Sequence, residues 1–77
     1  MDLQFRYFSC PDIKVSDIID NLDKTTQGIF LTEYNGALYW IISKDGFFEF
    51  NDGYTTTATG DFKAAQKMLE KFIKDNN

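Results

Sequence analysis

The chain has 77 residues, of which 43% are hydrophobic, 17% aromatic and 26% charged, and its net charge is −4 at pH 7. A chain of this length builds one hydrophobic core, so we expect a single domain over residues 1–77. With no histidine and only one cysteine, Cys10, it lacks the commonest zinc ligand and general base and cannot form an intrachain disulfide. We therefore expect no catalytic residues, no metal and no cofactor.

The N-terminal residues predict a strand. Apolar and polar side chains alternate from Leu3 to Phe8, and Pro11 ends the pattern because it lacks the N–H that a strand ladder needs. No basic region followed by an apolar run opens the chain, and the longest apolar run is the six residues Ala37 to Ile42. These features favour a cytoplasmic protein without membrane contact.

The residues after Pro11 change to a helical period. Apolar side chains recur at i, i+3, i+4 and i+7, which places on one helix face Val15, Ile18, Ile19 and Leu22. The opposite face carries Asp17, Asp20 and Asp23. We expect a short amphipathic helix whose acids are solvated, or else form an acidic contact surface for a basic partner.

A strand meander follows, punctuated by Asn35-Gly36, Asp45-Gly46 and Asp52-Gly53. Asn-Gly favours a two-residue type I′ hairpin, which would set Tyr34 opposite Ala37. The same geometry at Asp45-Gly46 then places on one sheet face Phe30, Tyr34, Tyr39, Ile41, Phe48 and Phe50. The other face receives Ile29, Leu31, Leu38, Trp40, Ile42 and Phe47. Both faces are therefore apolar, and we expect Trp40 to be buried and Tyr54 to Thr59 to form a short edge strand.

The last segment predicts a helix. Thr59 or Asp61 can cap its first turn. One stripe about 100° wide holds Phe62, Ala65, Leu69, Phe72 and Ile73. A separate face holds Lys63, Lys67, Lys71 and Lys74. The stripe is typical of a core face, and the lysine row is typical of a solvated face or of a ridge that contacts phosphates.

Together these elements predict an α+β fold. We expect an antiparallel three- to four-stranded meander with two helices and an additional N-terminal strand, in the order β-α-β-β-β-α. The chain shows no repeat and no linker, so every element should share one core.

From Asp12 onward, the order helix, three strands, helix is similar to the double-stranded RNA-binding domain, and residues 64–69 read like the last helix of that family. The resemblance implies topology alone. That family begins its second helix with a lysine cluster, where this chain reads Thr59-Gly60-Asp61-Phe62-Lys63. Its strand 1–2 loop carries a histidine, where this chain has Asn35-Gly36, so no RNA-contacting role is carried over.

A second resemblance is to the small accessory proteins of bacteriophages. It is one of size and style, and depends on the aromatic meander with Tyr39-Trp40 and Asp45-Gly46-Phe47 and on the terminal helix opened by residues 62–65. It implies a phage-encoded factor acting in the host cytoplasm.

The main functional hypothesis is a non-enzymatic interaction protein that binds and inhibits or modulates another protein, as a phage host-takeover or anti-defence factor would. Two helices on one sheet face would leave the other face as an exposed aromatic patch, which usually marks a partner site. The expected partner-binding residues are Phe30, Tyr34, Tyr39, Ile41, Phe48 and Phe50. Homodimerisation through this face, or helices on both faces, are the alternatives.

The competing hypothesis is an RNA-binding module. Residues 61–77 carry a net charge of +1, whereas residues 1–60 carry −5, so a basic footprint exists only on the last helix. Its phosphate-contacting ridge would be Lys63, Lys67, Lys71 and Lys74. Because the whole chain is acidic, a protein partner is favoured over nucleic acid.

Overall fold

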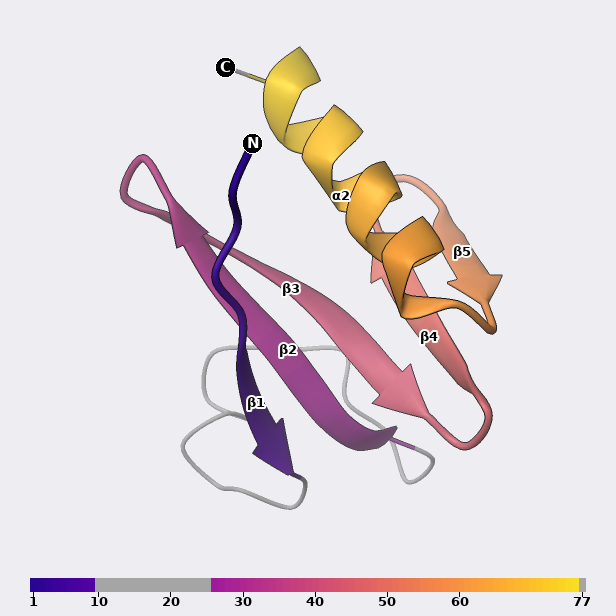
Figure 1. Ribbon diagram of the computed structural model, residues 1–77. Helices are drawn as coiled ribbons and strands as arrows, with labels where there is room; N and C mark the ends of the chain where they lie inside the picture. The colour runs from indigo at the N-terminus through magenta and orange to yellow at the C-terminus, as the bar shows by residue number, and fades with distance from the viewer. Residues whose placement is uncertain (10–25, 77) are drawn as a thin grey trace.

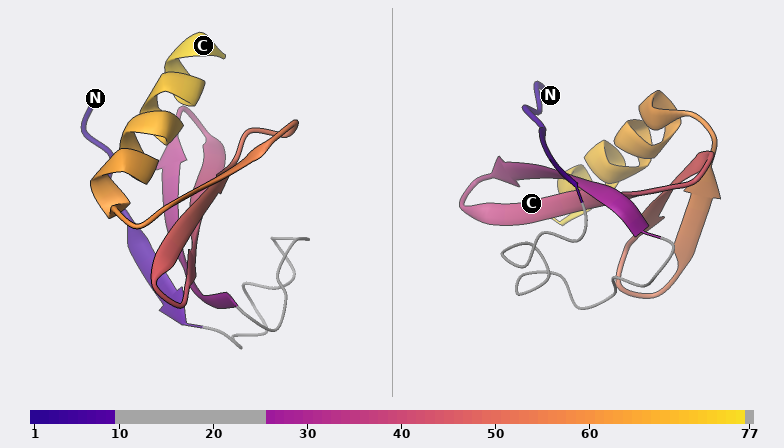
Figure 2. Two further views of the ribbon diagram at one scale, coloured as in Figure 1. Left: turned by 90° about the vertical axis from the view of Figure 1, so that its right-hand side faces the viewer. Right: turned by 90° about the horizontal axis from the view of Figure 1, so that it is seen from below.

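The computed structural model describes residues 1–9 and 26–76, which form five strands and one helix. The strands make one antiparallel sheet in chain order, β1-β2-β3-β4-β5 (Figure 1). Their bounds are β1 Arg6–Ser9, β2 Thr26–Tyr34, β3 Ala37–Lys44, β4 Phe47–Asn51 and β5 Thr56–Thr59. The helix α2, Phe62–Asp75, packs across one face of this sheet (Figure 2).

The α+β class and the antiparallel meander are confirmed, with two differences in the elements. The described residues hold five strands, one more than the order β-α-β-β-β-α, and the edge strand expected over Tyr54 to Thr59 is present as residues 56–59, paired with β4. The N-terminal strand begins at Arg6 rather than Leu3, although Leu3 is buried in the core. The expected helix around Val15 to Leu22 lies outside the described residues.

The two hairpin turns set the register that the sequence predicts. Asn35 and Gly36 both have positive φ, 52° and 80°, as a type I′ turn requires, and Tyr34 lies opposite Ala37. At the next turn Lys44 lies opposite Phe47, again as expected, but only Gly46 has positive φ. The two-residue loop length, rather than the exact turn type, therefore fixed the register here.

Helix α2 begins and packs as its sequence pattern predicts. The Asp61 side chain is the N-cap and accepts a hydrogen bond from the Lys63 N–H, while the Thr59 hydroxyl accepts one from the Asp61 N–H. Ala65, Leu69 and Ile73 are fully buried. Capping at Asp61 thus aligns the apolar stripe with the sheet.

Two phenylalanines of α2 insert between the aromatic side chains of the sheet. Phe62 lies with its ring centre 4.6 Å from that of Phe30 and 5.5 Å from that of Phe48. Ten residues further on, Phe72 lies 5.6 Å from Phe50 and 6.2 Å from Tyr39. These edge-to-face contacts fasten both ends of the helix to the sheet.

The expectation that this sheet face is an exposed partner patch is therefore wrong. Ile41 and Phe50 are buried in the core, and the other four expected binding residues pack against it: Phe30, Tyr34, Tyr39 and Phe48. The physical reason is that α2 covers this face, so their area is used in folding. On the opposite face, Trp40 is half-buried rather than buried.

Candidate functional site

The ladder between β3 and β4 is much shorter than the ladder between β2 and β3. Strand β3 pairs with β2 along its whole length, from Ala37 to Lys44, but pairs with β4 only from Ile42 to Lys44. Beyond the pair Ile42 and Glu49, β4 diverges from β3 (Figures 1 and 2). The sheet therefore splits into two ribbons, β1-β2-β3 and β4-β5.

A cleft of about 590 Å³ lies at this split. Its lining comes from β3, from β4 and the turn after it, from β5 and from α2. The lining residues are Leu38, Tyr39, Trp40, Ile42, Lys44, Glu49, Phe50, Asn51, Asp52, Gly53, Thr56, Leu69 and Phe72. We refer to it as the β3–β4 cleft. Its volume is within the usual range for ligand sites.

The cleft runs along the edge of β3 rather than along a face of the sheet. Leu38, Tyr39 and Trp40 are consecutive and all line it. Because consecutive strand residues point to opposite faces, only a cavity at the strand edge can touch all three. The backbone of β3 is thus part of the cleft wall.

The walls combine apolar area with one ion pair. Leu38 is 42% exposed, Trp40 is half-buried and Phe72 reaches the cleft from α2. Lys44 Nζ lies 2.8 Å from Glu49 Oε1, and the two side chains are only 12% and 18% exposed. Partial burial weakens solvent screening, so this pair helps hold β4 to β3 where their ladder is short.

The turn from Asn51 to Thr56 forms one rim of the cleft and is held by its own hydrogen bonds. Asp52 Oδ1 accepts from the N–H groups of Tyr54 and Thr55, both at 2.8 Å. Asn51 Oδ1 accepts from the Gly53 N–H, and Asn51 Nδ2 donates to the Thr56 hydroxyl. Polar side chains therefore order this turn without help from the core.

The same hydrogen bonds stabilise the ionised form of Asp52, which is the form present at neutral pH. The backbone N–H groups of Thr55 and Tyr54 stabilise its carboxylate and lower its pKa below the usual 3.8. The rim consequently carries a negative charge at neutral pH.

Tyr54 stands out at the centre of this turn because its side chain is 96% exposed. A single exposed aromatic residue is common on protein surfaces. Here, however, it belongs to an ordered turn whose neighbouring residues Asp52 and Gly53 line the cleft. An exposed aromatic side chain on an ordered turn beside a partly apolar cleft is the type of residue that is enriched in interaction hot spots.

The structure brings only part of the expected site into the cleft. Of the six expected binding residues, Tyr39 and Phe50 line it, from the side of α2. Sequence reasoning missed Leu38, Trp40 and the turn residues. The turn signal at Asp52-Gly53 was visible, but nothing in the sequence marks the point at which β4 leaves β3.

The lysines of the expected nucleic-acid ridge lie on the outer side of α2. All four are exposed, namely Lys63, Lys67, Lys71 and Lys74. Glu70 and Asp75 lie on the same helix, so its surface is mixed in charge. The ridge exists as a surface, but with acidic residues beside it.

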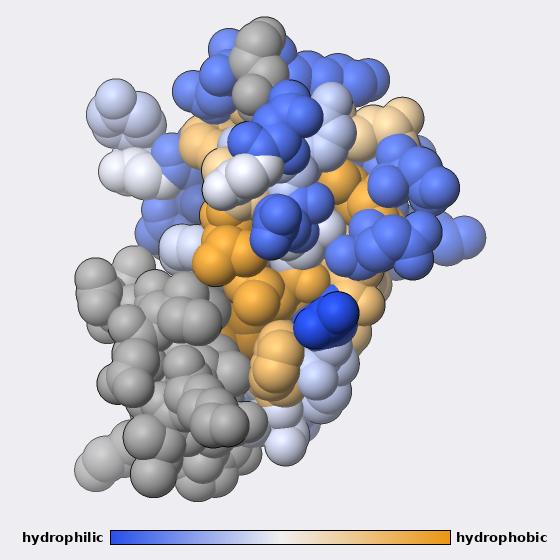
Figure 3. Space-filling model, turned by 90° about the vertical axis from the view of Figure 1, so that its left-hand side faces the viewer, coloured by the Kyte–Doolittle hydropathy of each residue, from blue (hydrophilic) through white to orange (hydrophobic). Residues whose placement is uncertain are grey.

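A second apolar area lies on the side of the molecule that carries β1 and the N-terminus (Figure 3). Met1 and Tyr7, at 45% and 51% exposure, are the most exposed large hydrophobic side chains of the N-terminal segment, and Phe5 and Phe8 are half-buried. The β3–β4 cleft, by contrast, is a cavity with a defined set of lining residues. The cleft is therefore the stronger candidate.

Comparisons of the chain with protein-family models, curated proteins and solved structures find no match. Within residues 1–9 and 26–76, no helix is both long enough and apolar enough to cross a membrane. In the same part of the chain, no three side chains of the types His, Cys, Asp and Glu are grouped as metal ligands.

Proposed function

We propose that the protein is a small, non-enzymatic binding module that recognises another protein through the β3–β4 cleft and inhibits or modulates it. The observation that carries this proposal is the cleft of about 590 Å³, lined by both apolar and polar groups, beside an ordered turn that exposes Tyr54. A concave surface that combines apolar area with a few polar groups, next to an exposed aromatic side chain, is typical of binding sites.

The order of the site supports binding. The turn is held by the side chains of Asn51 and Asp52, and the opposite wall is a strand fully paired to β2. A partner would therefore meet surfaces that lose little conformational freedom on association. The charged groups Lys44 and Glu49 bind each other, which favours a structural role for them over acid-base chemistry.

The biological setting we propose is a phage-encoded host-takeover or anti-defence factor in the host cytoplasm. Its support is the resemblance in size and style to bacteriophage accessory proteins. The cleft is the part of the molecule on which such a role would depend.

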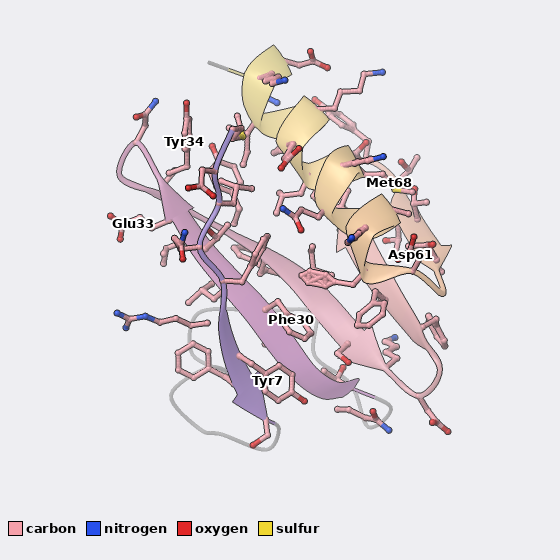
Figure 4. All side chains as sticks on the ribbon, in the orientation of Figure 1. Tyr7, Phe30, Glu33, Tyr34, Asp61 and Met68 are labelled. Atoms are coloured by element: carbon pink, nitrogen blue, oxygen red, sulfur yellow. The ribbon has the colours of Figure 1, made fainter. Side chains whose placement is uncertain are left out.

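Site-directed crosslinking tests the proposal. A photoreactive phenylalanine analogue replaces Tyr54 in one sample and the exposed Glu33 of β2 in the control (Figure 4). We expect a crosslinked partner protein from position 54 alone. Excess unmodified wild-type protein should compete for the partner and suppress this adduct, whereas excess Trp40→Ala protein should not. Equal adducts from both positions, or adducts that Trp40→Ala also suppresses, would contradict recognition through the cleft.

A second candidate function, RNA binding, is favoured by one observation: the four lysines of α2 are all exposed. Such a ridge predicts duplex-RNA binding that weakens steeply with salt. A gel shift at low salt tests it, with the four lysines changed together to glutamate as the comparison. Absence of a complex at micromolar protein would exclude this function.

A further inference from the structure

We propose that the partner of the β3–β4 cleft enters it as an extended segment that adds a strand to the edge of β3 at Leu38 and Trp40, and that this segment is basic. The inference deepens the proposed function and rests on it. Three observations support it: the hydrogen-bond register of β3, the position of the cleft along the β3 edge, and the charge of the residues that line the cleft.

The register decides which backbone groups of β3 face the cleft. In a two-residue hairpin the residues that flank the turn, Tyr34 and Ala37, exchange both of their backbone hydrogen bonds. Alternate residues of β3, Tyr39 and Ile41, then also bond to β2. Leu38 and Trp40 direct their N–H and C=O groups to the other side, toward β4.

On that side the ladder has already ended. Its last pair is Ile42 and Glu49, so Leu38 and Trp40 have no partner residue there in the sheet of the described chain. A strand edge without a partner strand presents a row of backbone donors and acceptors on which another strand can pair. An extended peptide supplies such a strand with the required spacing, as in other cases of strand addition.

The cleft gives such a peptide room to reach this edge. The part of β3 beyond the β4 ladder, Ala37–Ile41, spans about 13 Å at about 3.3 Å per residue. Side chains of an added strand would alternate between the Trp40 side and the Tyr39 side. Both sides are lined by apolar groups, and Phe72 closes the second.

The charge of the cleft identifies the kind of peptide. Its ionisable lining groups are Lys44, Glu49 and Asp52, and the first two are paired. One carboxylate remains in excess, in a chain of net charge −4. A lysine or arginine in the segment would be attracted to the Asp52 rim, whereas a second copy of this acidic chain would be repelled.

Selected peptides provide the first test. Linear ten-residue peptides from a random display library are selected on the wild-type protein, and each backbone amide of a binder is then methylated in turn. We expect basic binders with alternating apolar residues, and an affinity loss of about tenfold or more at every second amide only. Binders that tolerate every methylation would overturn strand addition but not cleft recognition, and a library without binders would overturn both.

A matched pair of variants tests the same edge from the protein side. Leu38→Pro removes the N–H that faces the cleft, whereas Leu38→Ala shortens the side chain and keeps the N–H. We expect Leu38→Pro to weaken the selected peptide about tenfold or more, and Leu38→Ala to weaken it less. Equal effects of the two variants would overturn the inference.

An amide-exchange measurement on the wild-type protein does not depend on how either variant folds. Bound peptide should slow exchange at the Leu38 and Trp40 amides, and unchanged exchange would contradict strand addition. Analytical sedimentation compares the wild type with Leu38→Pro. If the wild type were a dimer and Leu38→Pro a monomer, this edge would bind a second copy of the chain, and the proposal would be overturned.

Discussion

The phenol ring of Tyr7 lies directly over Gly28, so that a side-chain carbon at position 28 would overlap the ring. The same ring packs on Phe30 at 4.8 Å, and the Tyr7 hydroxyl approaches the Gln27 carbonyl (Figure 4). Because an added methyl group must displace Tyr7, we expect Gly28→Ala to destabilise the protein by about 1 kcal/mol. Chemical denaturation of Gly28→Ala, Tyr7→Ala and the double variant measures this.

The double variant provides the control. Without the ring above it, alanine at position 28 is accommodated in extended backbone and loses less entropy on folding than glycine. We therefore expect Gly28→Ala to cost nothing in the Tyr7→Ala background. An equal cost in both backgrounds would show that the two residues are not coupled.

A buried threonine predicts a stabilising substitution. Thr32 is 2% exposed, and its hydroxyl oxygen has no hydrogen-bond partner. Thr32→Val removes this polar group and keeps the branched shape, so we expect the free energy of unfolding to rise by about 1 kcal/mol. The exposed Thr57 of β5 is the matched control, where the same change should stay within about 0.5 kcal/mol. A less stable Thr32→Val protein would mean that the hydroxyl is bonded in solution.

Buried and exposed side chains of the sheet should respond differently to truncation. Phe50 is 7% exposed and packs on Phe72, so we expect Phe50→Ala to cost about 3–5 kcal/mol. Leu38 is 42% exposed, so we expect Leu38→Ala to lower the free energy of unfolding by about 1 kcal/mol or less. Urea denaturation compares the two variants directly. Similar costs would contradict the buried position of Phe50 under α2 and the exposed position of Leu38.

Amide exchange in the unliganded protein checks the split of the sheet. The register predicts fast exchange at Leu38 and Trp40 and slow exchange at Tyr39 and Ile41, which bond to β2. Exchange followed by NMR reads each position separately. If Trp40 is as protected as Tyr39, the ladder to β4 continues further in solution and the cleft edge is closed.

Acid should weaken the turn that carries Tyr54. Hydrogen bonds from Thr55 and Tyr54 lower the pKa of Asp52, so the folded state binds its proton less readily than the unfolded state does. The stability that Asp52 contributes is therefore fully present above its usual pKa of 3.8 and is lost as the pH falls through its lower folded value. The stability difference between the wild type and Asp52→Ala should shrink only in that acidic range. A difference that shrinks near neutral pH would exclude Asp52 as its cause.

The register and the α2 stripe could be predicted because they depend on local rules. Loop length sets which residues of a hairpin face each other, and a 3.6-residue period sets the buried face of α2. The choice of sheet face could not be predicted in this way. Both faces are apolar, and the choice depends on how Phe62 and Phe72 fit between the aromatic rings of the Phe30 side.

The cleft was beyond sequence reasoning for a different reason. Where a ladder ends depends on sheet twist and on the packing of β4 against α2, and neither leaves a local signal at Trp40 or Asn51. The sequence indicated the turn at Asp52-Gly53. Without knowledge that β4 diverges from β3, that turn indicated no binding site.

The short ladder between β3 and β4 has a mechanical consequence. Three residue pairs beside the Asp45-Gly46 turn join the two ribbons of the sheet in the described chain. Further from the turn, α2 bridges the two ribbons, because Phe72 packs on Phe50 of β4 and on Tyr39 of β3. The spacing between Trp40 and the Asn51–Thr56 turn is therefore set jointly by these pairs and by Phe72, so that substitutions at Lys44, Glu49 or Phe72 would change the width of the cleft.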